Sequence, residues 1–196
     1  MRPQDDEKRQ RILDSTSQII MTQGVAAVSL SKIAKAASIA SGTLYTYFAD
    51  KDDMLRSLYL DRKQRIAKAI TNIDVDGNPR QALSHFLDLV YAYGQAHLED
   101  LLLIREFGQT AILRQLNIPQ TEAMRGFEPL EAFVRHGIDQ HVFFDTNYQA
   151  LLNYAYAPVI EYLIDLQNGT YTSAEVSFEQ IKQLSMRAII LKENHD

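Results

Sequence analysis

Apolar residues recur along this chain with the spacing of amphipathic helices. The first helix is predicted from an i, i+4, i+7, i+8 pattern over Ile12, Leu13, Thr16, Ile19 and Ile20. Gly24 follows as a suitable helix stop, and Ser29 is a natural N-cap for a second helix. That short helix carries Leu30, Ile33 and Ala34 inward and ends near Ala37.

The next stretch, SGTLYTYF at 41–48, predicts a brief third helix with an uncharged polar outer face. Leu44, Tyr47 and Phe48 share its inner face, while hydroxyl-bearing residues and Gly42 lie outside. Asp50 can cap a fourth helix, whose first turn holds further acids that the helix dipole favours. The inner stripe of this helix is Met54, Leu55, Leu58 and Tyr59.

A break follows at 74–79, DVDGNP, where an Asp-Gly pair favours a turn and the proline suits a first helical turn. Beyond it, further amphipathic segments follow: Leu83 to Tyr91, Leu101 to Leu116, and Met124 to Ile138. Two last helices are expected at about 147–166, capped by Asp145 or Thr146, and at 173–191, with a Thr172–Glu175 capping box. No alternating strand pattern interrupts them, so the fold class is all-α, with about nine helices.

The second and third helices, joined by a tight turn, have the form of a helix-turn-helix. In such a motif the second helix enters the major groove of DNA. Hydroxyls and a glycine allow close approach and donation to phosphates or base edges, and Tyr45 or Tyr47 adds stacking area. An ordinary surface helix has the same spacing, so this pattern alone leaves both interpretations open.

Charge is uneven along the chain. Residues 1–65 hold 11 Lys and Arg against 8 Asp and Glu, whereas residues 66–196 hold 9 against 17. A mildly basic first third on an acidic remainder indicates that only the first part approaches a polyanion. Chance variation in surface charge gives the same counts.

Several functional classes lack support in the sequence. The chain has no cysteine, which excludes disulfides and thiolate sites and fits a reducing cytoplasm. No apolar run approaches the ~18 residues of a membrane span, and residues 1–11 lack the apolar stretch of an export signal. His136 and His141 lack the i, i+4 spacing of a zincin, and neither a G-x-S-x-G elbow nor a phosphate-binding glycine loop occurs. We therefore expect a cytoplasmic protein with no metal, no cofactor and no catalytic residues.

Residues 8–58 resemble the DNA-binding domain of the tetracycline-repressor (TetR) family of bacterial regulators. The resemblance runs through RILDSTSQIIMTQGVAAVSLSKIAKAASIASGTLYTYFADKDDML and is most specific in GTLYTYF, with KIAKAA upstream and Lys51 three residues after it. It implies a three-helix DNA-binding domain at 1–58, with the fourth helix continuing to about 73 as a connector. Residues 75–196 match only in architecture and would form a helical bundle for ligand binding and dimerisation.

The resemblance also implies roles for individual residues. Ser29 sits where the family places a hydroxyl on a phosphate, and Lys51 matches its phosphate-anchoring lysine. Ser41, Gly42 and Thr43 occupy the part of the recognition helix that faces base edges. Tyr45, Thr46 and Tyr47 fall where the family contacts phosphates and thymine methyl groups.

The chain departs from the family pattern before the recognition helix. Where Gly-Val-Ser is common it has Ser38-Ile39-Ala40, so Ala40 replaces the serine cap and the helix start shifts to Ser41. A basic residue is also common at position 41. Its absence makes shape readout and hydroxyl contacts more important than arginine readout.

For the remainder, the family implies a homodimer formed by the last two helices and a small-molecule pocket among the middle helices. Interface candidates are Leu151, Ala155, Val159, Phe178, Ile181, Leu184 and Ala188, although each could equally be core. Pocket candidates are the aromatic-rich set Tyr91, His97, Phe107, Phe127, Tyr154 and Tyr162, although an aromatic at helical spacing is usually core. Pro158 is expected to bend its helix.

The functional expectation is a repressor that a small hydrophobic or aromatic ligand releases from a palindromic DNA operator. Two alternatives stay open. One is a family member controlled by a protein partner, or acting as an activator, without a small ligand. The other is a helical carrier of hydrophobic compounds that no longer binds DNA, which the missing basic residue at position 41 would suggest.

Overall fold

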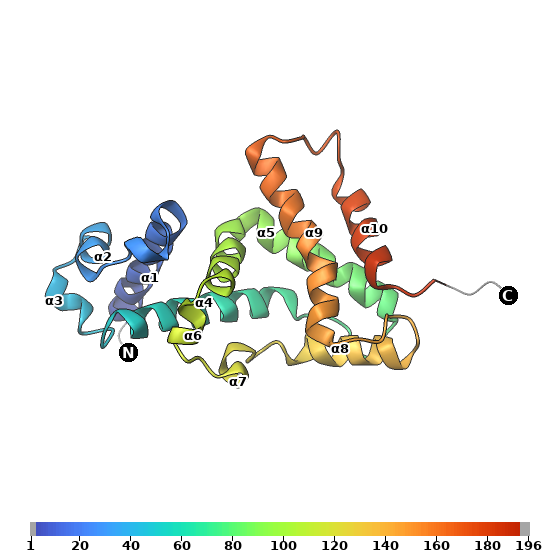
Figure 1. The fold of residues 1–196 in the computed structure, drawn as a ribbon, viewed down its shortest axis with the longest axis horizontal. Helices are drawn as coiled ribbons and strands as arrows, with labels where there is room; N and C mark the ends of the chain where they lie inside the picture. Colours follow the sequence, from blue (N-terminus) through green and yellow to red (C-terminus); the bar gives the residue numbers. More distant parts are fainter. Residues whose placement is uncertain (1–2, 193–196) are drawn as a thin grey trace. The chain divides into compact units, whose positions relative to one another are not determined.

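The computed structural model describes residues 3–192, and within that range the secondary structure is helical (Figure 1). Ten α-helices and one 3-10 helix follow one another: α1 Pro3–Gln23, η1 Val25–Ala27, α2 Leu30–Ala36, α3 Ser41–Leu44, α4 Lys51–Ile70, α5 Pro79–Gln109, α6 Ile112–Gln115, α7 Gln120–Ala123, α8 Glu128–Asp139, α9 Tyr148–Asn168 and α10 Phe178–Ile189. A single β-bridge joins Phe143 to Ile190. The all-α prediction is confirmed.

The described chain forms two compact units. The first joins the chain up to Lys63 with Leu102–Ala123, and the second joins Gln64–Leu101 with the chain from Met124 onward. Helices α4 and α5 therefore each contribute to both units. The functional ranges expected from the sequence, 1–58 and 75–196, follow a different division, because residues 102–123 pack with the first unit.

The core of the first unit consists of the apolar positions that the helical spacing indicates. Ile12, Leu13, Ile33, Leu44 and Leu55 are each at most 1% exposed and belong to one hydrophobic cluster. Phe107, from the carboxy-terminal part of α5, joins this cluster, with its ring centroid 5.5 Å from that of Tyr59. Burial of such side chains contributes about 1.5–3 kcal/mol each. The periodicity of the first four helices thus predicts this core.

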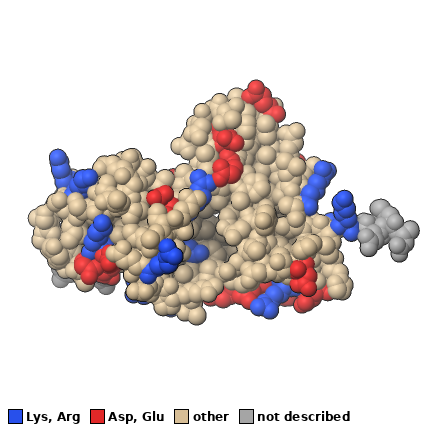
Figure 2. All heavy atoms as spheres, viewed as in Figure 1, with Lys and Arg blue, Asp and Glu red and all other residues tan. Residues whose placement is uncertain are grey.

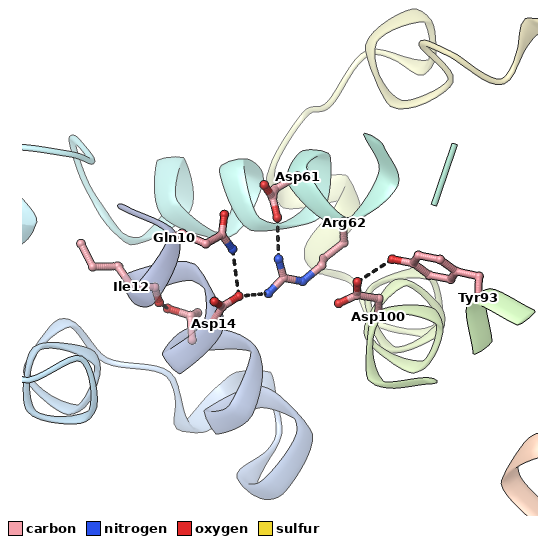
Figure 3. A network of polar contacts seen from close by, with 8 residues as sticks. Gln10, Ile12, Asp14, Asp61, Arg62, Tyr93 and Asp100 are labelled. Carbon is pink, nitrogen blue, oxygen red and sulfur yellow. Dashed lines mark hydrogen bonds and ion pairs between the residues drawn. The ribbon is translucent and has the colours of Figure 1, made fainter. Parts of the chain in front are cut away.

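A buried arginine on α4 forms an ion pair with α1 in the first unit. Arg62 is 3% exposed, and its guanidinium donates to Asp14 on α1 at 2.6 Å and to Asp61 at 2.5 Å (Figure 3). Gln10 donates to the same Asp14 oxygen. Because a buried guanidinium is costly without paired acceptors, these contacts hold the first helix in one register on α4.

The second unit packs α9 against α8 and α10 around aromatic side chains. The rings of Tyr91 and Phe178 stack at 3.9 Å, and Tyr162 lies 6.1 Å from Tyr91 and donates its hydroxyl to the Val176 carbonyl at 2.9 Å. Gly137 permits close packing of α8, since a Cβ there would lie 2.1 Å from the ring of Phe143. On α10, burial lowers the pKa of Lys182, but hydrogen bonds from its ammonium to Asp88 and Glu179 outweigh this and raise it.

Several predicted helix ends in the second unit are wrong. Asn147, not Asp145 or Thr146, caps α9, because its side chain accepts from the amides of Gln149 and Ala150. Helix α10 begins at Phe178 rather than 173, and its capping box is Ser177 with Gln180. Of the predicted capping box only one hydrogen bond forms, from the Thr172 amide to the Glu175 carboxylate, which also accepts the Thr172 hydroxyl. The Glu175 amide donates instead to the Thr172 carbonyl, and these contacts close a turn that precedes the helix.

The middle of the chain also differs from the prediction. The two segments expected at Leu83 to Tyr91 and Leu101 to Leu116 belong largely to one helix, α5, in which His97 has non-helical angles of φ −144° and ψ 46°. Pro158, expected to bend its helix, lies within α9, which continues to Asn168. The short helices α6 and α7 follow α5 and have too few residues to produce a helical period.

Candidate nucleic-acid interface

The interface is built on α2, which begins as its sequence indicates. Ser29 has extended angles, and its hydroxyl oxygen accepts the amide of Lys32 at 3.4 Å. This bond satisfies one of the unpaired amides at the start of the helix. The Ser29 hydroxyl also lies 3.3 Å from that of Ser31, and when Ser31 is the donor of this pair the Ser29 hydrogen can be donated to a phosphate oxygen.

A Schellman motif turns the chain from α2 into α3. Ser38 lies in the left-handed region with φ 55°, its amide donates to the Lys35 carbonyl, and the amide of Ile39 donates to that of Ala34. Ile39 is half-buried and packs against the core of the first unit. The motif is not evident from the sequence, because the left-handed position carries serine in place of the usual glycine.

Helix α3 is one turn long, with Ala40 at its N-cap and Ser41 as its first residue, as the departure from the family pattern predicts. Leu44 is 1% exposed and anchors the helix in the core. Ser41, Gly42, Tyr45 and Thr46 are exposed, with Tyr45 62% exposed, and Thr43 is half-buried. A Cβ added at Gly42 would have nothing within 4 Å. The protein itself therefore does not require glycine at this position.

Tyr47 and Lys51 stand at the end of this segment and are less exposed. Tyr47 is half-buried, and its hydroxyl lies 3.5 Å from an Asp5 carboxylate oxygen on α1. Burial and the charge of Asp5 raise the pKa of Tyr47, so its hydroxyl stays protonated and a donor. Lys51 opens α4, where Asp50 accepts the amide of Asp53 at 2.8 Å as the predicted cap.

Basic side chains surround this polar surface. Lys32 and Lys35 are exposed on α2, and Lys32 donates to Gln23. Arg9 on α1 places its guanidinium carbon 5.5 Å from the ring centre of Phe48. Such cations attract phosphate without reading sequence, while hydroxyls on α3 contact groups in the groove. The arrangement can bind a nucleic-acid duplex, and it contains no charged side chain on the outer face of α3.

The predicted pocket residues do not form one group. Tyr91 and Tyr162 contact one another in the aromatic cluster of the second unit, whereas Phe107 lies in the core of the first unit. Tyr154 is 71% exposed and His97 is exposed, so neither lines an interior within this chain. Phe127 is buried next to the start of α8.

The residues predicted for the dimer interface divide into two groups. Leu151, Ala155 and Val159 on α9 are at most 1% exposed, so they form intramolecular core and offer little surface to a partner. Phe178 and Ile181 on α10 are half-buried, while Leu184 and Ala188 are exposed. Tyr154, a predicted pocket residue, lies on the exposed face of α9.

Among the described residues, no three His, Asp or Glu side chains come together as a metal-binding group. Within the same residues, no helix is both long enough and apolar enough to cross a membrane.

Comparison with known proteins supports this account of the interface. Residues 12–58, which span α2, α3 and the flanking parts of α1 and α4, match the family model described as bacterial regulatory proteins of the tetR family. The chain is thus an all-helical protein with an amino-terminal helix-turn-helix. Over residues 12–58 it is similar to the TetR family of regulators.

Two curated relatives extend the match beyond the helix-turn-helix. The HTH-type transcriptional regulator SrpR of Pseudomonas putida is 21% identical over 136 residues, which cover 69% of this chain and 63% of that protein. The fatty acid metabolism regulator protein of Bacillus subtilis is 30% identical over 114 residues, 58% of this chain and 54% of that protein. The matched regions therefore span less than two thirds of these relatives, both of which are named as regulators and neither as an enzyme.

A solved structure shares the fold along almost the whole chain. The TetR family transcription regulator from Marinobacter aquaeolei VT8 superposes with a TM-score of 0.82 at 22% identity, covering 98% of this chain and all of that one. The carboxy-terminal helices therefore belong to the same architecture, although their sequence has diverged.

Proposed function

We propose that the protein is a transcriptional repressor that binds a palindromic DNA operator as a homodimer. The observation that carries the proposal is the outer face of α3, where Ser41, Gly42, Tyr45 and Thr46 are exposed and uncharged while Leu44 fixes the helix in the core. Such a face can enter a groove and exchange hydrogen bonds with base edges. Its position in a segment that matches the TetR family model supports the same role.

Homodimer formation rests on the outer faces of α9 and α10. Tyr154 is 71% exposed and Leu184 is 59% exposed, and Ala188 lies one turn beyond Leu184. Large exposed apolar side chains of this kind mark protein interfaces. A two-fold dimer would place two α3 helices on half-sites separated by one or more turns, ~34–36 Å per turn of DNA.

An effector would act by binding one conformation of this dimer more tightly than the other. The aromatic cluster of Tyr91, Tyr162 and Phe178 suits a hydrophobic or aromatic compound, because it gathers three rings with centroids 3.9–6.4 Å apart. One relative is named for fatty acid metabolism, which agrees with an apolar effector.

The operator is tested by selecting sequences from a random duplex pool and sequencing those retained at moderate salt. The expected result is an inverted repeat. Its affinity is then measured for two variants, Tyr47→Phe, which removes only the hydroxyl, and Lys51→Ala. Lys68→Ala, at an exposed position near the end of α4, serves as the charge-matched control.

Lys51→Ala should weaken binding to all sequences and reduce the slope of log affinity against log salt by about one, since one phosphate contact is lost. Tyr47→Phe should weaken operator binding by several-fold without changing the melting temperature. Unchanged affinity in both variants would refute the proposed interface. Enrichment of no motif by a folded dimer would favour the carrier function.

A further inference from the structure

A groove in the second unit lies between the start of α5 and the end of α10. It has a volume of about 620 Å³ and is lined by Arg80, Gln183, Met186, Arg187, Ile190, Leu191 and Lys192. This volume falls within the range of ~300–1,000 Å³ found for small-molecule sites. None of the pocket residues indicated by the sequence lines it.

Three cations converge on this groove in an acidic part of the chain. Residues 66–196 hold only nine Lys and Arg against 17 Asp and Glu, yet Arg80, Arg187 and Lys192 all line the same groove, and no acidic residue between positions 3 and 192 does. Among residues 3–192, no ion pair joins Arg187 or Lys192 to a carboxylate. Figure 2 shows acidic side chains along α8, whereas basic ones lie near the end of α10. Like charges repel one another, and an anion would relieve this repulsion.

The groove also has an apolar side. Met186 and Ile190 are half-buried, and Leu191 is 37% exposed. Gln183, Met186, Arg187 and Ile190 follow an i, i+3, i+4, i+7 spacing and therefore share one face of α10. Leu184 and Ala188 lie on the neighbouring face, so the groove is separate from the proposed dimer contact.

We propose that this groove binds an amphipathic anion, in which a carboxylate or phosphate head is joined to an apolar chain. The head lies beside Arg187 and Lys192, whose guanidinium and ammonium groups form charge-assisted hydrogen bonds with such oxygens. The chain lies on Met186, Ile190 and Leu191, which removes apolar surface of both partners from water. The site requires neither DNA binding nor the aromatic cluster.

The test is isothermal titration calorimetry of the full chain with decanoate, decyl phosphate, inorganic phosphate and neutral 1-decanol. Decanoate or decyl phosphate should bind at least tenfold more tightly than either inorganic phosphate or 1-decanol, because only they satisfy both sides of the groove. The tighter of the two identifies the head group. Equal binding of inorganic phosphate or of 1-decanol would overturn the proposal.

Two double variants localise the binding. Arg187→Gln/Lys192→Gln removes two exposed charges from the groove and should weaken decanoate at least tenfold. Arg114→Gln/Arg135→Gln makes the same change in net charge at exposed positions outside it and should leave decanoate binding unchanged. An equal loss in both variants would assign the effect to the general field of the protein and refute the site. Ile190→Ser should weaken decanoate and leave inorganic phosphate unaffected.

Discussion

Two exposed surfaces of this molecule differ in chemistry. The outer face of α3 presents Ser41, Gly42, Tyr45 and Thr46, while the outer faces of α9 and α10 present Tyr154, Leu184 and Ala188. Exposed hydroxyls are hydrogen-bonded to water, and they can exchange this water for hydrogen bonds with a hydrated partner such as DNA. Apolar side chains gain only when water is excluded, which a second protein surface achieves. The difference agrees with the two partners proposed above, a nucleic acid and a second copy of the chain.

The largest expected effect comes from charging the apolar surface. In Tyr154→Glu/Leu184→Glu, self-association should weaken on the order of 100-fold or more, because loss of each central apolar contact costs ~2 kcal/mol or more. Both positions are exposed in the chain, so the monomer should remain folded. Analytical ultracentrifugation measures the dissociation constant.

Met21→Glu is the matched control, because Met21 is also apolar and 38% exposed but lies on α1. Its self-association should be unchanged. An intact dimer in the double variant would show that the exposed faces of α9 and α10 do not form the contact.

The polar surface is tested most sharply at Gly42. Gly42→Ala adds a methyl group where nothing lies within 4 Å, so the free protein should keep or slightly gain stability, by up to ~1 kcal/mol. In a groove the same methyl group would separate α3 from the bases, and we expect affinity for the operator to fall roughly 5- to 150-fold, equivalent to ~1–3 kcal/mol. Fluorescence anisotropy and thermal melting measure the two quantities.

Gly108→Ala provides the control, because Gly108 is exposed on α5 and also has nothing within 4 Å of its added Cβ. It should gain similar stability and retain full DNA affinity. Equal affinity of the Gly42 and Gly108 variants would mean that α3 does not approach DNA closely.

The two regions also differ in how far the sequence predicts them. In the first unit, local signals and apolar spacing agree, so the Ser29 cap, the Asp50 cap and the buried stripe from Met54 to Tyr59 are all confirmed. In the second unit, several residues compete for each helix start. Asn147 caps α9 in place of Asp145 or Thr146, and Ser177 caps α10 in place of Thr172. The position of each residue relative to the packed helix decides which cap forms.

The sequence predicts the exposure of a candidate residue where a short motif determines it. It does not predict exposure that depends on tertiary packing. Spacing placed Leu44 inward and Tyr45 outward, as observed. It could not separate an interior aromatic from an exposed one, so the pocket candidates include both Tyr154, which is 71% exposed, and Phe107, which lies in the core of the first unit. Arg80 is far in sequence from Arg187 and Lys192, and only folding brings it to the α10 groove.

A smaller change, in the free energy of unfolding, is expected from substitutions in the turns next to the two surfaces. Ser38 before α3 and Gly169 after α9 occupy the same left-handed position of a Schellman motif, with φ 55° and 71°. A residue with a Cβ pays ~1–2 kcal/mol there, partly offset by the ~0.5–1 kcal/mol entropy cost of glycine. Ser38→Gly should therefore stabilise the protein by up to ~1 kcal/mol, and Gly169→Ala should destabilise it by a similar amount. Urea unfolding measures both, and changes of the same sign would contradict the shared motif.

The smallest effect concerns the turn between α9 and α10, where Glu175 accepts from the Thr172 amide at 2.8 Å and from its hydroxyl at 2.9 Å. These hydrogen bonds lower the pKa of Glu175. Because the folded-state pKa is below that of the unfolded chain, the stabilisation is present at neutral pH and is lost as pH falls below about 4.5 through the folded-state value. Glu175→Gln should accordingly lower the melting temperature slightly at pH 7 and not at pH ~3. Glu99→Gln, the same change at an exposed position of α5, is the control and should show no such difference between the two pH values. If Glu175→Gln lowers the melting temperature equally at low pH, packing rather than the carboxylate charge supports the turn.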